Sequence, residues 1–385
     1  MNTSPKEIAV VMVSMDRHIL KEDSTVSGRM KEYARCFGEL HIILFATKGQ
    51  EEKIARDGYT IYPTNSLTKF HHITSARAVG EKLLPSIQSR FLNVVVSVSD
   101  PFETGWVGKY LKRRFKVALQ VQVHTDFLSG YFMRGSVYNP VRILAARRVL
   151  QCADGVRVVS ERIRRSLIES NIHISAPIDV LPIFVEEKEF LSPRQETGEN
   201  TVVTLSRLEK EKNIESAIRI FKKVHDANRN TRLIVIGDGS ERKSLEQLAE
   251  FEGLTDSVTF AGWLKTPEKI LQKATVFLHT SYYEGYGIAL IEAALAGVPM
   301  VTTNVGVAEE LVDNGSNSFV IDVHNLDEFA EKITFLLQDP RLRTMMSERI
   351  RIRAKELTKI TKSEYMAEYA ELHRKALEHF LSTNS

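Results

Sequence analysis

The stretch from residue 274 to residue 299 constrains the fold more than any other part of the chain. It reads ATVFLHTSYYEGYGIALIEAALAGVP. The apolar run 274–279 predicts a buried strand, the polar residues after it predict a turn, and the run from Ile288 predicts a helix that ends at Gly297. A strand, a glycine-containing turn and a helix place the N–H groups of a helix N-terminus just beyond a strand end. Those N–H groups lack intrahelical partners, so the pattern favours an anion there.

Two carboxylates flank this predicted anion site. Glu284 lies in the turn and Glu292 eight residues later in the helix, a separation of roughly 12 Å at ~1.5 Å per residue. The amides expected to face a diphosphate are those of Gly285, Tyr286, Gly287 and Ile288. Each carboxylate would accept hydrogen bonds from hydroxyls, which favours a nucleotide sugar as ligand. The alternative is a buried strand–helix unit with two incidental glutamates, although an unpartnered carboxylate in an apolar helix is costly.

The length and the cysteines narrow the class of protein. A chain of 385 residues exceeds one ordinary core, so two domains are expected. Cys36 and Cys152 lie far apart, which fits a reducing cytoplasm better than a disulfide framework. No apolar run approaches ~20 residues, so no membrane-spanning helix is expected, and the first apolar run reads as a strand and not as a signal peptide.

The charge is distributed unevenly along the chain. Residues 1–185 carry 26 lysines and arginines against 17 acidic residues, and residues 186–385 carry 26 against 32. The excess of positive charge gathers in 110–116, 142–148 and 157–165. A basic first half predicts an anionic partner such as a membrane surface, with ordinary solvated helix faces as the alternative. Nucleic acid is not expected, because aromatic residues are not interleaved with these charges.

Short apolar runs alternate with helical patterns in both halves, which predicts two Rossmann-like α/β domains with parallel sheets. The expected organisation is an acceptor-binding domain over 1–185, a linker over 186–199, a nucleotide-sugar-binding domain over 200–360 and a last helix over 361–385. Ligands bind beyond the C-terminal ends of the strands in such sheets. The residues that follow each strand are therefore the candidates for a site.

In the second half, Arg207 and Lys212 follow the strand 200–206 and could neutralise a diphosphate leaving group. The alternative for each is a solvated charged turn. Gly237 follows the strand 232–237 in a Gly-x-Gly segment, and we interpret it as allowing a nucleotide to approach the backbone closely. No cluster of metal-ligand spacing occurs, so no metal and no cofactor are expected.

In the first half, His124 ends the strand 116–124 and could orient a sugar hydroxyl, with a structural histidine as the alternative. Asp126 lies two residues after His124 and is a further candidate for contact with an acceptor or a phosphate. Ser27 and Gly28 stand immediately before a helix expected from about Arg29, so the loop that holds Gly28 could lay amides on a phosphate or an acceptor. Asp100, in the loop after the strand 92–99, could also meet an acceptor.

These motifs together resemble the family-4 retaining glycosyltransferases with the GT-B fold. The resemblance is strongest over residues 200–325. It is carried by SRLEKEKN, LIVIGDGSERKSLE, VTFAGW, EGYGIALIEA, AGVPMVTTNVG and EELVDNGSNSFVI, and more loosely by QVHTDF and GVRVVSERI. Two departures fall in the first domain. Only Ser27–Gly28 fills a loop that has two glycines in many members, and residues 182–186 replace the usual Asn-Gly-Val-Asp. In the second domain, Asn213 replaces a glycine.

The resemblance implies two facing Rossmann-like domains with a cleft between them and a C-terminal helix that crosses back to the first domain. It implies that Arg207 and Lys212 bind the donor diphosphate, that Glu284 contacts the donor sugar and that Glu292 contacts the ribose. It also implies metal-independent transfer with retention at the anomeric carbon, and it makes His124 the cleft histidine.

The sequence as a whole therefore predicts a cytoplasmic retaining glycosyltransferase. It would move a sugar from a UDP- or GDP-sugar to a hydroxyl of a glycan or lipid-linked acceptor, with the basic first domain docked on the anionic inner face of a membrane. The alternatives are a nucleotide-sugar epimerase on the same scaffold and a non-catalytic relative that binds a glycan or lipid.

Overall fold

The computed structural model describes residues 3–190 and 198–384. The chain divides into two compact units. Unit 1 comprises Met1–Pro182 and Thr361–Ser385, and unit 2 comprises Ile183–Ile360. Much of the predicted linker lies outside the described residues, and Glu187–Phe190 forms the short helix η4. Within the two described ranges, none of the helices combines the length and apolar character needed to cross a bilayer.

Unit 1 is built on a sheet with the strand order β3-β4-β2-β1-β5-β6-β7-β8. The strands are β1 (Ile8–Ser14), β2 (Glu39–Leu44), β3 (Ile54–Arg56), β4 (Tyr59–Pro63), β5 (Asn93–Val98), β6 (Ala118–Val123), β7 (Gly155–Val158) and β8 (Ile178–Val180). Pairing is parallel except between β3 and β4, a hairpin that the sequence analysis did not predict. Its turn is Asp57–Gly58, a dipeptide typical of tight hairpins, and Gly58 has φ of 85°.

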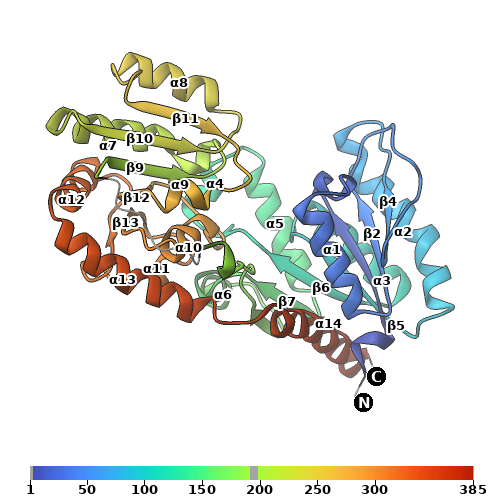
Figure 1. Ribbon diagram of the computed structural model, residues 1–385. Coiled ribbons are helices and arrows are strands. Elements are labelled where there is room, and N and C mark those ends of the chain that lie inside the picture. Colours follow the sequence, from blue (N-terminus) through green and yellow to red (C-terminus); the bar gives the residue numbers. More distant parts are fainter. Residues whose placement is uncertain (1–2, 191–197, 385) are drawn as a thin grey trace. The chain divides into compact units, whose positions relative to one another are not determined.

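Helices cover both faces of this sheet (Figure 1). The helices of unit 1 are η1 (Pro5–Glu7), η2 (Arg17–Leu20), α1 (Thr25–Cys36), η3 (Lys69–His71), α2 (His72–Gln88), α3 (Glu103–Phe115), α4 (Gly130–Arg134), α5 (Asn139–Leu150), α6 (Glu161–Glu169) and α14 (Lys362–Asn384). α3 packs against α2 and α5, whereas α14 packs against α1 and across β5, β6 and β7. The predicted return of the C-terminal helix to the first domain is confirmed.

The start of α1 differs from the prediction. Ser24 caps the helix by accepting a hydrogen bond from the amide of Ser27 at 3.0 Å, so the helix begins at Thr25 and not near residue 29. Gly28 therefore lies in the first turn of α1 instead of before it. A Cβ atom at Gly28 would meet nothing within 4 Å, so this position faces open space.

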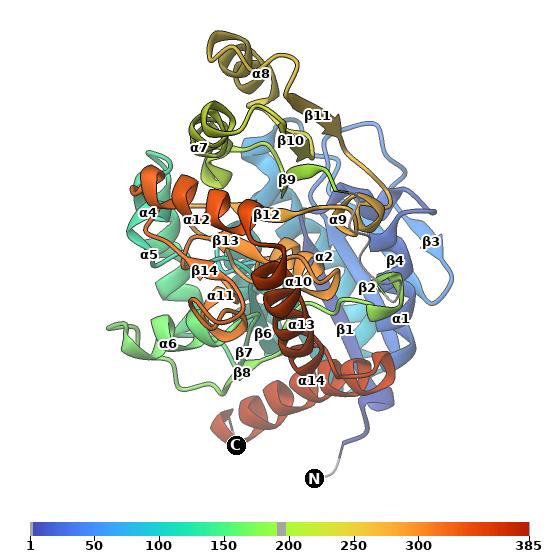
Figure 2. The same ribbon diagram turned by 60° about the vertical axis from the view of Figure 1, so that its left-hand side comes forward.

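Unit 2 has a parallel sheet with the strand order β11-β10-β9-β12-β13-β14, and its strands are labelled in Figure 2. The strands are β9 (Asn200–Leu205), β10 (Thr231–Ile236), β11 (Val258–Gly262), β12 (Val276–His279), β13 (Met300–Thr302) and β14 (Phe319–Val320). The helices are η5 (Lys210–Lys212), α7 (Ile214–Ala227), α8 (Arg242–Phe251), α9 (Glu268–Leu271), α10 (Ile288–Leu295), α11 (Ala308–Leu311), α12 (Leu326–Gln338) and α13 (Pro340–Leu357). α7 packs on α8 and α12, and α10 packs on α9 and α13. The predicted α/β architecture is confirmed in both units.

The strand order of unit 2 fixes where a ligand can bind. The first strand of the unit, β9, lies between β10 and β12, so the chain leaves β9 toward one edge of the sheet and later returns to the other side of it. Such a reversal opens a crevice beyond the carboxyl ends of the two strands concerned, and ligands of doubly wound sheets bind there. In unit 2 this point is the pair of turns that follow β9 and β12.

Candidate functional site

The turns after β9 and β12 are tied to each other by hydrogen bonds to main-chain carbonyl oxygens. The amide of Tyr282 donates to the carbonyl oxygen of Glu211 at 2.9 Å. The hydroxyl of Thr280 donates to the carbonyl oxygen of Asn213 at 2.9 Å, and the side-chain amide of Asn213 donates back to the carbonyl oxygen of Thr280 at 3.2 Å. Asn213 has φ of 52°, a left-handed conformation that asparagine tolerates. These bonds bring side chains together that lie about 70 residues apart in the sequence.

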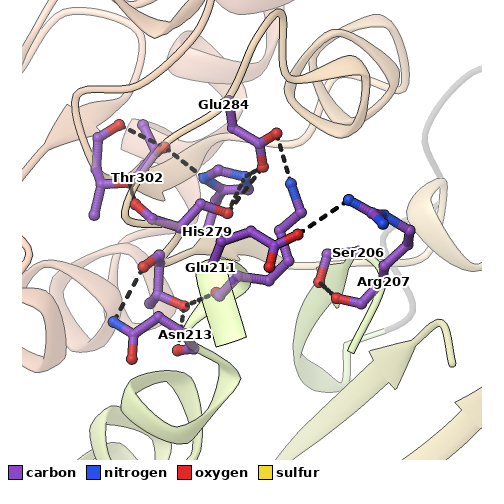
Figure 3. A network of polar contacts seen from close by, with 11 residues as sticks. Ser206, Arg207, Glu211, Asn213, His279, Glu284 and Thr302 are labelled. Carbon is purple, nitrogen blue, oxygen red and sulfur yellow. Dashed lines mark hydrogen bonds and ion pairs between the residues drawn. The ribbon is translucent and has the colours of Figure 1, made fainter. Parts of the chain in front are cut away.

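A buried ion pair joins the two turns. Lys212 Nζ donates to Glu284 Oε2 at 2.7 Å, and the two side chains are only 11% and 13% exposed (Figure 3). Glu284 Oε1 lies 3.2 Å from His279 Nε2 and accepts a hydrogen bond from the hydroxyl of Ser281 at 2.9 Å. Burial alone would raise the pKa of Glu284, but the hydrogen bond from His279 and the charge of Lys212 outweigh it and lower the pKa to about 2. Glu284 is therefore ionised at neutral pH.

His279 connects this carboxylate to the next strand. It is buried at the end of β12, and its Nδ1 atom lies 3.3 Å from the hydroxyl of Thr302 at the end of β13. The sequence pattern predicted His279 only as the last residue of a strand and indicated no role for Ser281 and Thr302. His279 is a polar residue at the end of an apolar strand, shortly before Glu284, and this pattern could have identified it as a candidate.

Arg207 also follows β9, but unlike Lys212 its side chain is exposed to solvent. Its side chain is 72% exposed and pairs with Glu211 Oε1 at 3.0 Å (Figure 3). The turn after β9 therefore presents one solvated cation, Arg207, and one buried cation, Lys212, that is paired with Glu284. An exposed pair of this kind contributes little to stability, so Arg207 can exchange Glu211 for another anion at small cost.

The N-terminus of α10 completes the site in unit 2. Gly287 caps the helix with φ of 85°, and Glu292 is partly buried about one and a half turns further on. The loop at Gly306 supports the turn, because the amide of Val307 donates to the carbonyl oxygen of Tyr286 at 2.7 Å. A Cβ atom at Gly306 would stand 2.3 Å from that oxygen, so the loop can approach only as glycine. The turn 284–287 is thus held rigidly against its neighbour.

Gly237 has a structural function that the sequence did not reveal. It has φ of 133°, and a Cβ atom there would stand 1.8 Å from the carbonyl oxygen of Ser206. Its amide donates to the carbonyl oxygen of Gly262 at 2.8 Å. The space that the missing side chain leaves is filled by the neighbouring chain segment after β9. Close packing of the backbone therefore requires this glycine, and its contact with a nucleotide stays a prediction.

Two candidate residues of unit 1 lie at and just after the end of β6. His124 follows β6, is exposed and has its Nε2 atom 3.1 Å from Gln122 Oε1. Asp126 is partly buried, which raises its pKa, and accepts a hydrogen bond from Ser166 at 3.4 Å.

Asp100 holds the loop that leads into α3. Its Oδ1 atom accepts from the amide of Phe102 at 2.7 Å and its Oδ2 atom accepts from the hydroxyl of Thr104 at 2.8 Å. Burial raises the pKa of Asp100 to about 6. These bonds give Asp100 a structural function, and its contact with an acceptor stays a prediction.

Two family models match the chain. The model described as glycosyl transferases group 1 matches residues 185–353, and the glycosyl transferase 4-like domain matches residues 25–183.

Two curated relatives match about half of the chain. A GDP-mannose-dependent alpha-(1-6)-phosphatidylinositol monomannoside mannosyltransferase of Mycobacterium tuberculosis (strain ATCC 25618 / H37Rv) is 30% identical over 52% of this chain. An alpha-monoglucosyldiacylglycerol synthase of Streptococcus pneumoniae (strain ATCC BAA-255 / R6) is 26% identical over 54% of it. The matches span 57% and 51% of the lengths of these two relatives.

Solved structures match nearly the whole chain. A sucrose-phosphate synthase of Thermosynechococcus elongatus has a TM-score of 0.79 at 17% identity, and the match covers 96% of this chain and 99% of the other. The Anabaena protein HepE in complex with UDP and glucose has a TM-score of 0.72 at 18% identity, covering 94% and 98%. At these identities the similarity establishes the fold.

Proposed function

Since this chain belongs to the glycosyl transferases group 1 family and has the GT-B fold, we propose that it transfers a sugar from a UDP- or GDP-sugar to a hydroxyl of a glycan or lipid-linked acceptor. The observation that carries the proposal is the buried pair of Lys212 and Glu284 where β9 and β12 end. A cation and a carboxylate held side by side suit a ligand with a diphosphate next to a group rich in hydroxyls.

In this proposal Lys212 and Arg207 bind the donor diphosphate together with the amides at the start of α10. Glu284 accepts hydrogen bonds from hydroxyls of the donor sugar, and its low pKa keeps it an acceptor at neutral pH. Glu292 contacts the ribose. The name of the mycobacterial relative supports a GDP-sugar and the HepE complex supports a UDP-sugar, so both donors stay in the proposal.

The proposed reaction retains the configuration at the anomeric carbon and needs no metal ion. The bond between C1 of the sugar and the phosphate oxygen breaks, and the electron pair leaves with the diphosphate. The acceptor oxygen forms the new bond to C1 from the same face, and its proton passes to the departing phosphate oxygen. Lys212 and Arg207 stabilise the charge that grows on the diphosphate, because positioned cations act most strongly where charge develops.

A panel of UDP-, GDP- and ADP-sugars tests the donor site by thermal shift. A ligand that binds the folded state alone raises the apparent melting temperature, and at 100 times its Kd it stabilises by about 2.7 kcal/mol. We expect one nucleotide series to raise the melting temperature of the wild-type protein and to do so far less in Arg207→Met. No shift with any nucleotide or nucleotide sugar would contradict the proposed donor site.

We further propose that the protein is cytoplasmic and docks on an anionic membrane surface through α2, α3 and α5. Four cations and two aromatic residues of α2 and α3 line a shallow pocket, namely Arg77, Trp106, Lys109, Tyr110, Arg113 and Arg114. On α5 and the turn before it, Val137, Tyr138 and Val141 are exposed. Exposed apolar groups beside clustered cations suit an interface of acyl chains and phosphate headgroups.

Replacing Arg113 and Arg114 with serine is expected to weaken binding to anionic vesicles, because each cation near such a surface contributes about 1 kcal/mol. Loss of both predicts a fall in affinity of about 30-fold at low salt. Co-sedimentation with phosphatidylglycerol vesicles measures it, with Lys222→Ser/Lys223→Ser on α7 as the charge-matched control. The idea fails if wild-type binding is independent of anionic lipid or if both double variants lose the same affinity.

A further inference from the structure

Arg157 is a buried cation that the proposed reaction does not use. It lies in β7 with 2% of its surface exposed. Its guanidinium donates to the carbonyl oxygens of Leu181 and Pro182 at 3.0 and 3.1 Å, to Gln122 Oε1 at 2.9 Å and to the hydroxyl of Tyr365 at 2.8 Å. All of these acceptors are neutral. Burying a charge with neutral partners alone is costly, so a fold that retains it has a use for it beyond packing.

The orientation of Gln122 follows from Arg157. A guanidinium has donors and no acceptor, so the atom of the Gln122 amide that faces it must be the oxygen. The amide nitrogen then points the other way, and it donates to the hydroxyl of Tyr369 at 3.1 Å and to that of Ser97 at 3.3 Å. Gln122 is 6% exposed, and all three contacts come from elements that pack around it. The amide therefore has one orientation.

The same oxygen faces His124. Gln122 Oε1 lies 3.1 Å from His124 Nε2, and an amide oxygen can only accept a hydrogen bond. The proton of the neutral imidazole is therefore on Nε2. Nδ1 then carries a lone pair and is an acceptor. The chemical character of this exposed histidine is thus set, through a single amide, by a buried arginine on the neighbouring strand β7.

The C-terminal helix supplies two members of this network. Tyr365 and Tyr369 of α14 reach Arg157 and Gln122, and the ring of Tyr369 stacks on Tyr33 of α1 with centroids 3.9 Å apart. Arg157 also lies 5.5 Å from the centroid of the Tyr369 ring, a distance at which a cation is attracted to the aromatic face. Helix α14 therefore packs across the sheet and also contributes side chains to the hydrogen-bond network that ends at His124.

We propose that Gln122 and Arg157 are positioning residues that hold His124 as the Nε2–H tautomer, with Nδ1 as an acceptor for a substrate hydroxyl. The proposal rests on the proposed function, in which His124 contacts a sugar hydroxyl. It specifies that this hydroxyl is a hydrogen-bond donor to the enzyme. Arg157 and Tyr365 act through Gln122, and none of the three needs to touch the substrate.

The tautomer is measurable without activity. Long-range ¹H–¹⁵N spectra of the full chain distinguish the two neutral tautomers, and the signals of His124 are assigned by their loss in His124→Gln. We expect the Nε2–H form in the wild type and a mixture of tautomers in Gln122→Met. Gln120→Met is the matched control, because Gln120 lies on the same face of β6, is 1% exposed and accepts from Ser97 Oγ. An Nδ1–H wild type, or a Gln122→Met spectrum equal to that of the control, overturns the proposal.

Gln122→Glu gives a second readout with almost no change of shape. A carboxylate beside His124 raises the pKa of the imidazole, and an imidazolium cannot accept through Nδ1. The other charged groups that act on it are Arg157 of β7 and Arg29 of α1, with Asp126 two residues away, and all are unchanged in this variant. We expect the acid limb of the kcat profile to move to higher pH while KM for the donor stays within about twofold.

The two readouts separate this proposal from the proposed function. A wild type with the Nε2–H tautomer but no turnover with any nucleotide sugar contradicts the transferase and leaves the positioning network intact. An active wild type whose pH profile is the same in Gln122→Glu contradicts the positioning role alone. Melting temperatures of all variants identify any loss of activity that is due to unfolding.

Discussion

Lys212→Met is expected to reduce donor turnover by about 10²- to 10³-fold, the usual effect of removing one group that stabilises developing charge. The variant keeps the length of the side chain but leaves Glu284 buried without its cation. Removing one partner of a buried ion pair costs about 3–5 kcal/mol, so the free energy of unfolding should also fall. Donor hydrolysis and urea denaturation measure the two effects on the same preparation.

Two controls separate chemistry from stability at this pair. In Lys212→Met/Glu284→Gln the orphaned charge is gone, so stability should recover while turnover does not. Arg207→Met removes an exposed cation whose pair with Glu211 is worth little, so turnover should fall and the melting temperature should stay within 1–2 degrees. Full turnover in Lys212→Met would contradict its assignment to the diphosphate.

Gly237→Ala is expected to destabilise unit 2 by more than about 4 kcal/mol, enough to unfold many domains. The added methyl group would stand 1.8 Å from the carbonyl oxygen of Ser206, a main-chain atom that cannot move without displacing the turn after β9. The left-handed φ of 133° adds strain. Circular dichroism during urea denaturation measures the loss.

Gly253→Ala is the matched control for this substitution. Gly253 also has a positive φ, 70°, but a Cβ atom there meets nothing within 4 Å. Its cost should be the backbone strain alone, about 1 kcal/mol. Equal losses in the two variants would show that strain and not the contact with Ser206 determines the effect at Gly237.

The sequence predicted the α/β architecture because alternating apolar runs and helical patterns have few other solutions. It did not predict the β3–β4 hairpin, although Asp57–Gly58 is a strong local signal for one. It could single out Lys212 and Glu284 by type and position, but not their ion pair. That contact depends on β9 and β12 being neighbours, and strand order is set by packing over distances that no local pattern records.

The residues of the donor site and of the His124 network that the sequence did not identify share one pattern. His279, Gln122 and Arg157 are polar residues inside or at the end of buried apolar strands, and each proves to hold another polar residue in place. Asp100 is a different case, since the carboxylate after this strand bonds within the loop before α3, and its contact with an acceptor stays a prediction. A polar residue in a buried strand is thus as informative as one in a loop, provided that its neighbours are known.

The proposed retaining, metal-independent transfer is best tested by hydrolysis of a nucleotide sugar by the wild-type protein, followed by ¹H NMR with EDTA present. Water serves as the acceptor, so no knowledge of the natural acceptor is needed. We expect slow release of the free sugar from one UDP- or GDP-sugar, with the anomeric configuration of the donor retained before mutarotation sets in. No release from any donor by a folded protein would contradict it, and so would release of the inverted anomer.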